Sequence, residues 1–199
     1  MSEKSRRDLL RDVGLSALAA VSVDSAAAQH VHQMAADDSK TSGGVYKPKI
    51  LTAHEFATLE RLTDLILPPE GASPGALAAG AAAWIDMLAA ENAQLAMIYT
   101  GGLARLDDSM RARCGQDFVS APVAEQTALL DLIAYRKNES DGFGADIRFF
   151  DWARRMTVDA FYTSKLGIKE IDYRGNTALA KYEVPVEAID FALKKSGFA

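Results

Sequence analysis

Histidine and cysteine are the residue types that most often serve as metal ligands, acid–base groups or nucleophiles. This chain has only three histidines and one cysteine. His30 and His32 form a His-x-His pair that could hold a metal, but no cluster of carboxylates or cysteines accompanies it. We prefer the alternative, a solvated stretch without a ligand. His54 precedes Glu55, but no second histidine follows four residues on, so the zinc-protease motif is absent. We expect His54 on the first turn of a helix, and no metal site.

Other catalytic and cofactor-binding patterns are also missing. The sequence has no glycine-rich dinucleotide fingerprint, no phosphate loop, no Glu-x-x-His pair and no nucleophile elbow. A single cysteine excludes a covalently attached c-type haem and an internal disulfide. Cys114 is therefore either a buried free thiol, which we prefer, or half of an intermolecular bridge. We expect a chain that has no catalytic residues and binds no cofactor of its own.

The N-terminus carries the one motif with a clear meaning. Arg6 and Arg7 follow a serine and precede two leucines and another arginine. This order is typical of a twin-arginine export signal. The apolar run behind it, residues 13–23, is far shorter than the roughly 20 residues that a spanning helix needs. An ordinary amphipathic helix is the alternative.

A small-residue pattern, Ala26-Ala27-Ala28, follows the apolar run and predicts cleavage between Ala28 and Gln29. Residues 1–28 are then a signal peptide that directs the protein to the periplasm. The twin-arginine route carries proteins that are already folded. An export signal of this kind on a chain without a cofactor suggests that the cargo is a bound partner.

The remaining chain is long enough for one domain with a core. The net charge is −5, and no basic patch is interleaved with aromatic residues, which argues against nucleic-acid binding. Residues 29–50 show no helical or strand period and contain a polar, glycine-bearing run. We expect them to form a flexible arm, followed by a single domain over residues 51–199.

Helical signals begin at Thr52, which is spaced from Glu55 as in a capping box, with Leu51 and Phe56 at the positions of a hydrophobic staple. Apolar residues then recur at helical spacing as far as Ile66. Further helices are expected over about 74–90, 93–113, 122–137 and 145–164 and from Pro185 onward. Strand alternation is absent, which predicts an all-α, compact domain of about five to six helices.

The helix expected over 145–164 is apolar on nearly all sides. Such a helix is either central in its domain or covered by a partner. The segment that follows, residues 166–183, has no clear period and contains several turn residues.

Several stretches resemble the gluconate 2-dehydrogenase subunit 3 family in order and spacing. At the start of the domain these are Leu51-Thr52-Ala53-His54-Glu55-Phe56, Leu65-Ile66-Leu67-Pro68, Ser73-Pro74-Gly75-Ala76 and Trp84-Ile85-Asp86. Near the other end they are residues 157–164 and 167–176. With the export signal, the resemblance covers nearly the whole chain.

The resemblance implies a non-catalytic small subunit of a periplasmic sugar, polyol or gluconate dehydrogenase. In this family a leaderless large subunit of the glucose-methanol-choline type holds FAD, and a multihaem cytochrome c subunit often passes electrons to the membrane. The small subunit carries the leader and escorts the flavoprotein through the twin-arginine translocase. Some relatives have several cysteines, whereas this chain has only Cys114. A stand-alone periplasmic protein and an enzyme with an unrecognised site are the alternatives.

The interface with the large subunit is expected near the end of the long apolar helix and in the irregular segment after it. Binding residues are often carried by loops that a rigid scaffold positions, and tyrosine combines an apolar ring with a polar tip. The residues expected to contact the partner are Tyr162, Ser164, Tyr173, Gly175 and Asn176.

Overall fold

The computed structural model describes residues 25–41, 45–172 and 184–196, and within these ranges all the regular elements are helices. This confirms the predicted all-α fold. The helices are α2 (Ser25–Thr41), α3 (Ala53–Ile66), α4 (Gly75–Ala78), α5 (Ala81–Ala90), α6 (Ala93–Cys114), α7 (Val123–Ile133), the 3₁₀ helix η1 (Arg136–Asp141), α8 (Gly144–Thr163), α9 (Lys165–Glu170) and α10 (Val186–Ser196). None of the described helices is long and apolar enough to cross a membrane.

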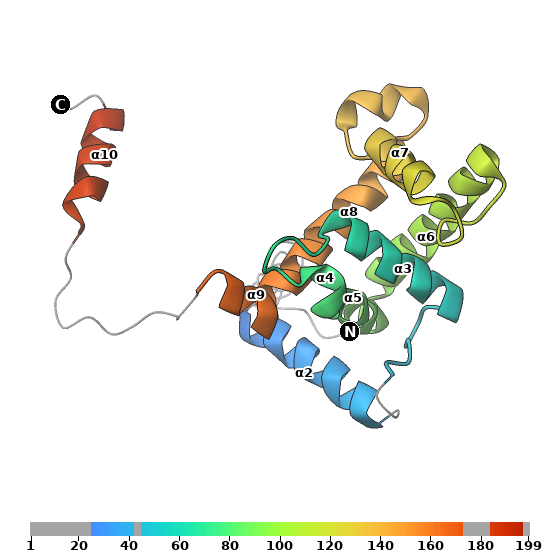
Figure 1. The fold of residues 1–199 in the computed structure, drawn as a ribbon, viewed down its shortest axis with the longest axis horizontal. Coiled ribbons are helices and arrows are strands. Elements are labelled where there is room, and N and C mark those ends of the chain that lie inside the picture. The colour runs from blue at the N-terminus through green and yellow to red at the C-terminus, as the bar shows by residue number, and fades with distance from the viewer. Residues whose placement is uncertain (1–24, 42–44, 173–183, 197–199) are drawn as a thin grey trace, which may run out of the picture.

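Helix α8 is the centre of the domain (Figure 1). It packs against α2 to α7, against η1 and against α9. Its side chains Ala153, Ala160 and Phe161 are completely buried. The apolar character of α8 is therefore explained by neighbours within the chain, which decides between the two alternatives that the sequence left open.

Two predicted helix starts are confirmed by their caps. The Thr52 side chain accepts a hydrogen bond from the Glu55 backbone N–H at 3.2 Å, and the Glu55 carboxylate accepts one from the Thr52 N–H at 2.8 Å. The Asn92 side chain likewise accepts from the Leu95 N–H at 3.0 Å at the start of α6. Each bond satisfies a backbone donor that the first turn of a helix leaves free.

The prediction of a single helix over 74–90 is wrong, because the structure has two helices in this stretch, α4 and α5. Gly80, between the two helices, has a φ of +71°, in the left-handed region that interrupts a right-handed helix, and Gly75 at the start of α4 has a φ of +73°. A Cβ on Gly75 would also lie 2.6 Å from the Pro69 nitrogen. The helix expected over 122–137 is shorter as well, since α7 ends at Ile133 and a 3₁₀ helix follows.

Helix α6 is continuous through Gly102, although glycine in a helix interior is destabilising. A Cβ at this position would overlap the ring of Phe149 on α8. Glycine therefore serves a packing purpose here: it lets α6 and α8 approach each other closely.

We predicted a flexible arm over residues 29–50. This prediction is wrong for residues 29–41, which belong to α2. This helix packs against α5 and α8 along one edge of the bundle (Figure 1). Its inward face consists mainly of small side chains, with Ala28 and Ala35 buried and Val31 half-buried. Alanines at this spacing carry little apolar signal, and for that reason the pattern is easily missed.

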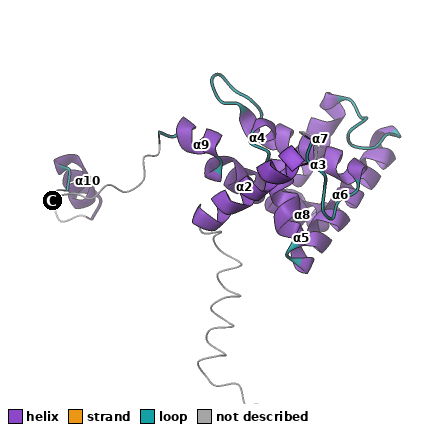
Figure 2. Cartoon of the chain, turned by 90° about the horizontal axis from the view of Figure 1, so that it is seen from below, coloured by secondary structure: helices purple, strands orange, loops and turns teal. Residues whose placement is uncertain are grey.

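Helix α10 is at the other extreme. None of its side chains is buried, and both views draw it apart from the other helices (Figures 1 and 2). The helix itself was predicted from Pro185 onward; its separation from the core was not.

Candidate partner interface

The predicted interface residues have different environments in the structure. Tyr162 lies on the last turn of α8 with 39% of its surface exposed, and its ring packs edge-on against that of Phe161, with centroids 5.1 Å apart. Tyr162 is thus available to a partner. Tyr173, Gly175 and Asn176 lie outside the described residues.

Ser164 is buried, with only 5% of its surface exposed. Its hydroxyl donates to the Phe161 carbonyl at 2.6 Å and accepts from the Gly167 N–H at 3.1 Å. Both bonds form the turn between α8 and α9, and Ser164 is the N-cap of α9. We therefore correct its predicted role from contacting a partner to positioning the turn beside Tyr162.

A groove of about 550 Å³ lies between α2, α4, the end of α8 and α9. Its wall includes Ala78 and Ala79 at the end of α4 and Leu166 and Ile168 from α9. Two lysines also contribute to its lining, Lys165 and Lys169. Leu166 is also exposed to solvent, as is Leu77 on α4. This end of the molecule combines an apolar patch with charged side chains around it, and protein interfaces commonly have an apolar centre and a polar rim.

Helix α10 offers a second apolar surface. Val186, Ile189 and Leu193 recur three and four residues apart, which places them on one helix face, and all three are exposed. A lone amphipathic helix is marginal in water, and most helices are stabilised by burying such a face. The pattern is typical of a helix that lays its apolar side in a groove of another protein.

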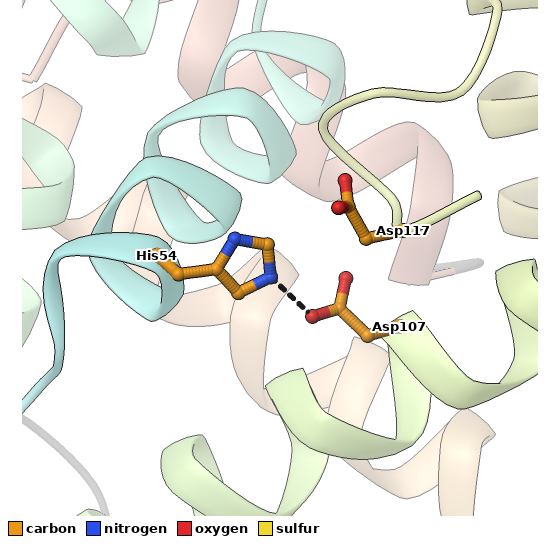
Figure 3. Close-up of side chains that lie close together, drawn as sticks. All are labelled: His54, Asp107 and Asp117. Carbon is orange, nitrogen blue, oxygen red and sulfur yellow. Dashed lines mark hydrogen bonds and ion pairs between the residues drawn. The ribbon is translucent and has the colours of Figure 1, made fainter.

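A different cluster has the chemistry of a metal site. Within the described residues, one group of three histidine, cysteine or acidic side chains brings its ligand atoms within 4.8 Å of one another: His54, Asp107 and Asp117 (Figure 3). His54 lies on the first turn of α3, Asp107 on α6, and Asp117 in the loop after α6. The sequence did not reveal this meeting, because His54 lies 53 positions before Asp107 in the chain.

The bonds within this cluster favour a structural role. His54 Nε2 lies 2.5 Å from Asp107 Oδ2, which also pairs with Arg111 at 3.6 Å, while Asp107 Oδ1 accepts from the Phe118 N–H at 2.9 Å. Both oxygens of the buried Asp107 thus have partners within the chain. A metal ion at this carboxylate would have to compete with the guanidinium of Arg111. Hydrogen bonds to Ser120 lower the pKa of Asp117. The cluster joins α3 to α6 and the loop behind it.

Asp86, in the resemblance motif Trp84-Ile85-Asp86, is completely buried on α5. Its carboxylate accepts hydrogen bonds from the Tyr46 hydroxyl at 2.8 Å and the Lys49 N–H at 2.6 Å. It also accepts from the N–H groups of the next two residues, at 3.3 and 3.2 Å. Burial and the neighbouring carboxylate raise the pKa of Tyr46. Asp86 thereby fixes residues 46–51, which lead into α3.

Comparison with known protein families shows to which family the chain belongs. The profile of the gluconate 2-dehydrogenase subunit 3 family matches residues 53–179. The chain belongs to this family. No curated protein and no solved structure matched the sequence in the corresponding comparisons. The family is named as a subunit of a dehydrogenase complex, which supports the predicted accessory role.

The matched residues begin at the first turn of α3 and end before α10. The core from α3 to α9 is therefore the shared family domain. Helices α2 and α10 lie outside the match on either side, one docked on the domain and the other without a buried side chain. These two helices are the parts of the structure that family membership does not explain.

Proposed function

We propose that this protein is the non-catalytic small subunit of a periplasmic FAD-dependent dehydrogenase of the glucose-methanol-choline type. It carries the leaderless flavoprotein through the twin-arginine translocase and stabilises it afterwards. The family match over residues 53–179 carries this proposal. Its support from the sequence is the Arg6-Arg7 motif on a chain without a recognisable catalytic or cofactor-binding pattern.

The electron-transfer groups belong to the partners in this proposal. FAD resides in the large subunit, and haem c in a cytochrome subunit that connects the complex to the membrane. The substrate is a sugar, polyol or sugar acid oxidised by the flavoprotein. This chain supplies the export signal and a contact surface, and no group that touches the substrate.

We place the contact surface at the end of α8, on α9 and on the apolar face of α10. Tyr162 and Leu166 are exposed on the first two elements, and Ile189 and Leu193 on the third. Lasting interfaces bury more than about 1,000 Å² and depend on a few apolar and aromatic anchors. These side chains supply such anchors, and Lys165 and Lys169 supply charge around them.

Co-expression with the flavoprotein, followed by periplasmic fractionation and pull-down, tests the proposal. Deleting this chain should leave the flavoprotein in the cytoplasm. Replacing Tyr162 and Leu166 together by alanine should reduce co-purification about tenfold or more, as the loss of interface anchors does. Tyr135→Ala is the matched control, because Tyr135 is also an exposed tyrosine but lies just after α7.

A flavoprotein that reaches the periplasm equally well without this chain would refute the escort role. If export needs the chain but tolerates both alanines, the escort role stands and the placement of the interface is wrong.

A further inference from the structure

The bond predicted to be cut during export lies inside a docked helix. Ala28 and Gln29 both belong to α2, which runs from Ser25 to Thr41. Ala28 has 0% of its surface exposed, and its carbonyl oxygen accepts a hydrogen bond from Trp84 Nε1 at 3.1 Å. Trp84 is itself completely buried on α5. The carbonyl that a peptidase would have to attack is therefore already bonded within the core.

A second contact holds the next turn of α2. The His32 ring stacks on Trp84 with centroids 5.7 Å apart, and its Nε2 lies 3.1 Å from Thr163 Oγ1 at the end of α8. The Thr163 hydroxyl donates to the Asp159 carbonyl at 2.6 Å, which leaves its oxygen to accept from the imidazole N–H. Trp84 thus clamps α2 from one side through its N–H and its ring.

The far end of α2 is also attached. Lys49 Nζ pairs with Asp38 at 2.6 Å, and the backbone N–H of the same Lys49 is bound by the buried Asp86. Freeing the helix would therefore require breaking contacts at both ends and uncovering Trp84. The docking is part of the fold and not a loose contact at the terminus.

Cleavage by a serine-type peptidase needs the opposite arrangement. The hydroxyl of the enzyme adds to the carbonyl carbon of the scissile bond, whose oxygen moves into an oxyanion hole. The carbonyl carbon of Ala28 is buried inside a helix, so the hydroxyl cannot reach it. Its oxygen is bonded to the Trp84 indole and cannot enter the oxyanion hole. Proteins on the twin-arginine route fold before they are exported, so the peptidase meets the folded form.

We infer that folding protects the Ala28–Gln29 bond, so that α2 is still intact after export. This rests on the export route in the proposed function. We thereby reassign residues 25–28 from the signal peptide, and residues 29–41 from the flexible arm, to a permanent part of the exported domain. The leader then stays attached to the complex unless it is cut upstream of α2.

Purified leader peptidase in detergent micelles tests the protection directly, with products read by mass spectrometry. The substrates are the folded full-length chain and a synthetic peptide of residues 1–41. The peptide should be cut after Ala28, and the folded chain at least about 100-fold more slowly, because cleavage of a protected bond follows the small open population. Equal rates would overturn the inference, as would a peptide that is not cut at Ala28.

Two variants test which contacts give the protection. Trp84→Phe removes the indole donor and keeps an aromatic ring, and His32→Ala removes the stacking partner; each should raise the cleavage rate of the folded chain about tenfold. Tyr99→Phe is the matched control, because Tyr99 is also completely buried but its hydroxyl has no hydrogen-bond partner. Circular dichroism checks that each variant is folded, and His32→Ala remains informative if Trp84→Phe unfolds. Folded variants cut at the wild-type rate would overturn the assignment.

N-terminal sequencing of the exported protein gives the corresponding result in cells. We expect a chain that retains all of residues 25–41, and an N-terminus at Gln29 or elsewhere within α2 would overturn the inference. The peptidase assay needs neither the flavoprotein nor export, so it can fail while the escort role stands. Deleting the chain tests escort alone and does not depend on where the leader is cut.

Discussion

Helices α2 and α10 flank the same family domain and differ in a way that sequence pattern does not anticipate. Helix α10 has a clear apolar face, yet none of its side chains is buried. Helix α2 has a face of alanines, yet it is docked through Ala28, His32 and Trp84. An amphipathic pattern shows that a helix needs a surface to pack on, but not that the surface belongs to the same chain. Directed hydrogen bonds and stacking can dock a helix that has little apolar pattern.

The contrast predicts that stability depends on the α2 side of the molecule, and the largest loss is expected at Asp86. Asp86→Ala would leave three backbone N–H groups and the Tyr46 hydroxyl without their acceptor. Each buried donor left unpaired costs about 1–3 kcal/mol. We expect the free energy of unfolding to fall by roughly 3 kcal/mol or more, since the penalties are partly relieved by water.

Urea denaturation measures this loss. Asp86→Asn is the matched control, because it keeps one acceptor oxygen and the shape of the side chain, and it should cost less than alanine. An alanine variant as stable as the wild type would show that residues 46–51 are not held by this carboxylate.

A smaller loss is expected for Trp84→Phe. The change leaves the Ala28 carbonyl without its donor and creates a small cavity beside α2. Together these effects should lower the free energy of unfolding by about 1–3 kcal/mol. The accompanying Tyr99→Phe variant should be nearly neutral. If both changes cost the same, the loss would not be specific to the hydrogen bond between Trp84 and α2.

Acid should weaken the docking of α2 through His32. Burial lowers the pKa of this imidazole, and a backbone hydrogen bond to Ala160 opposes the shift only in part. The neutral ring is therefore favoured in the folded chain. The stability contributed by His32 is complete above pH 6.5, the ordinary pKa of histidine, and is lost as the pH falls through the lowered pKa of the folded chain.

Thermal unfolding of the wild type and of His32→Phe between pH 7.5 and pH 5 measures this effect. The variant should lose less stability on acidification than the wild type, because it has no imidazole to protonate. Parallel pH profiles would show that protonation of His32 does not affect the fold.

The smallest effect on stability is expected in α10. Replacing Ile189 and Leu193 by aspartate should change the free energy of unfolding of the isolated chain by less than about 0.5 kcal/mol, as for other exposed positions. The same variant should co-purify poorly with the flavoprotein. A clear loss of stability in the isolated chain would mean that α10 packs on its own domain.

The sequence predicted the elements whose signals are local. The capping box at Thr52 and Glu55, the helix that begins at residue 93 and the long helix over 145–164 all rest on residues a few positions apart. Contacts between distant residues could not be predicted in this way. The bond from Trp84 to Ala28 spans 56 positions, and the bond from His54 to Asp107 spans 53.

The same limit applies to the candidate interface. Tyrosine at the end of a helix gave a reasonable expectation for Tyr162, which is exposed. Ser164 follows two residues later but turns inward, because its hydroxyl is needed for the turn into α9. Composition does not distinguish a serine that caps a helix from one that meets a partner, whereas the hydrogen-bond geometry does.

Hydrogen exchange, read by mass spectrometry on the free chain and on its complex with the flavoprotein, tests the contrast between the two helices most directly. Docked helices exchange slowly and undocked ones quickly. We expect α2 to be protected in both samples, and α10 to exchange freely in the isolated chain and become protected in the complex. Free exchange of α2 in the isolated chain, or an α10 that exchanges equally fast in both samples, would contradict this account.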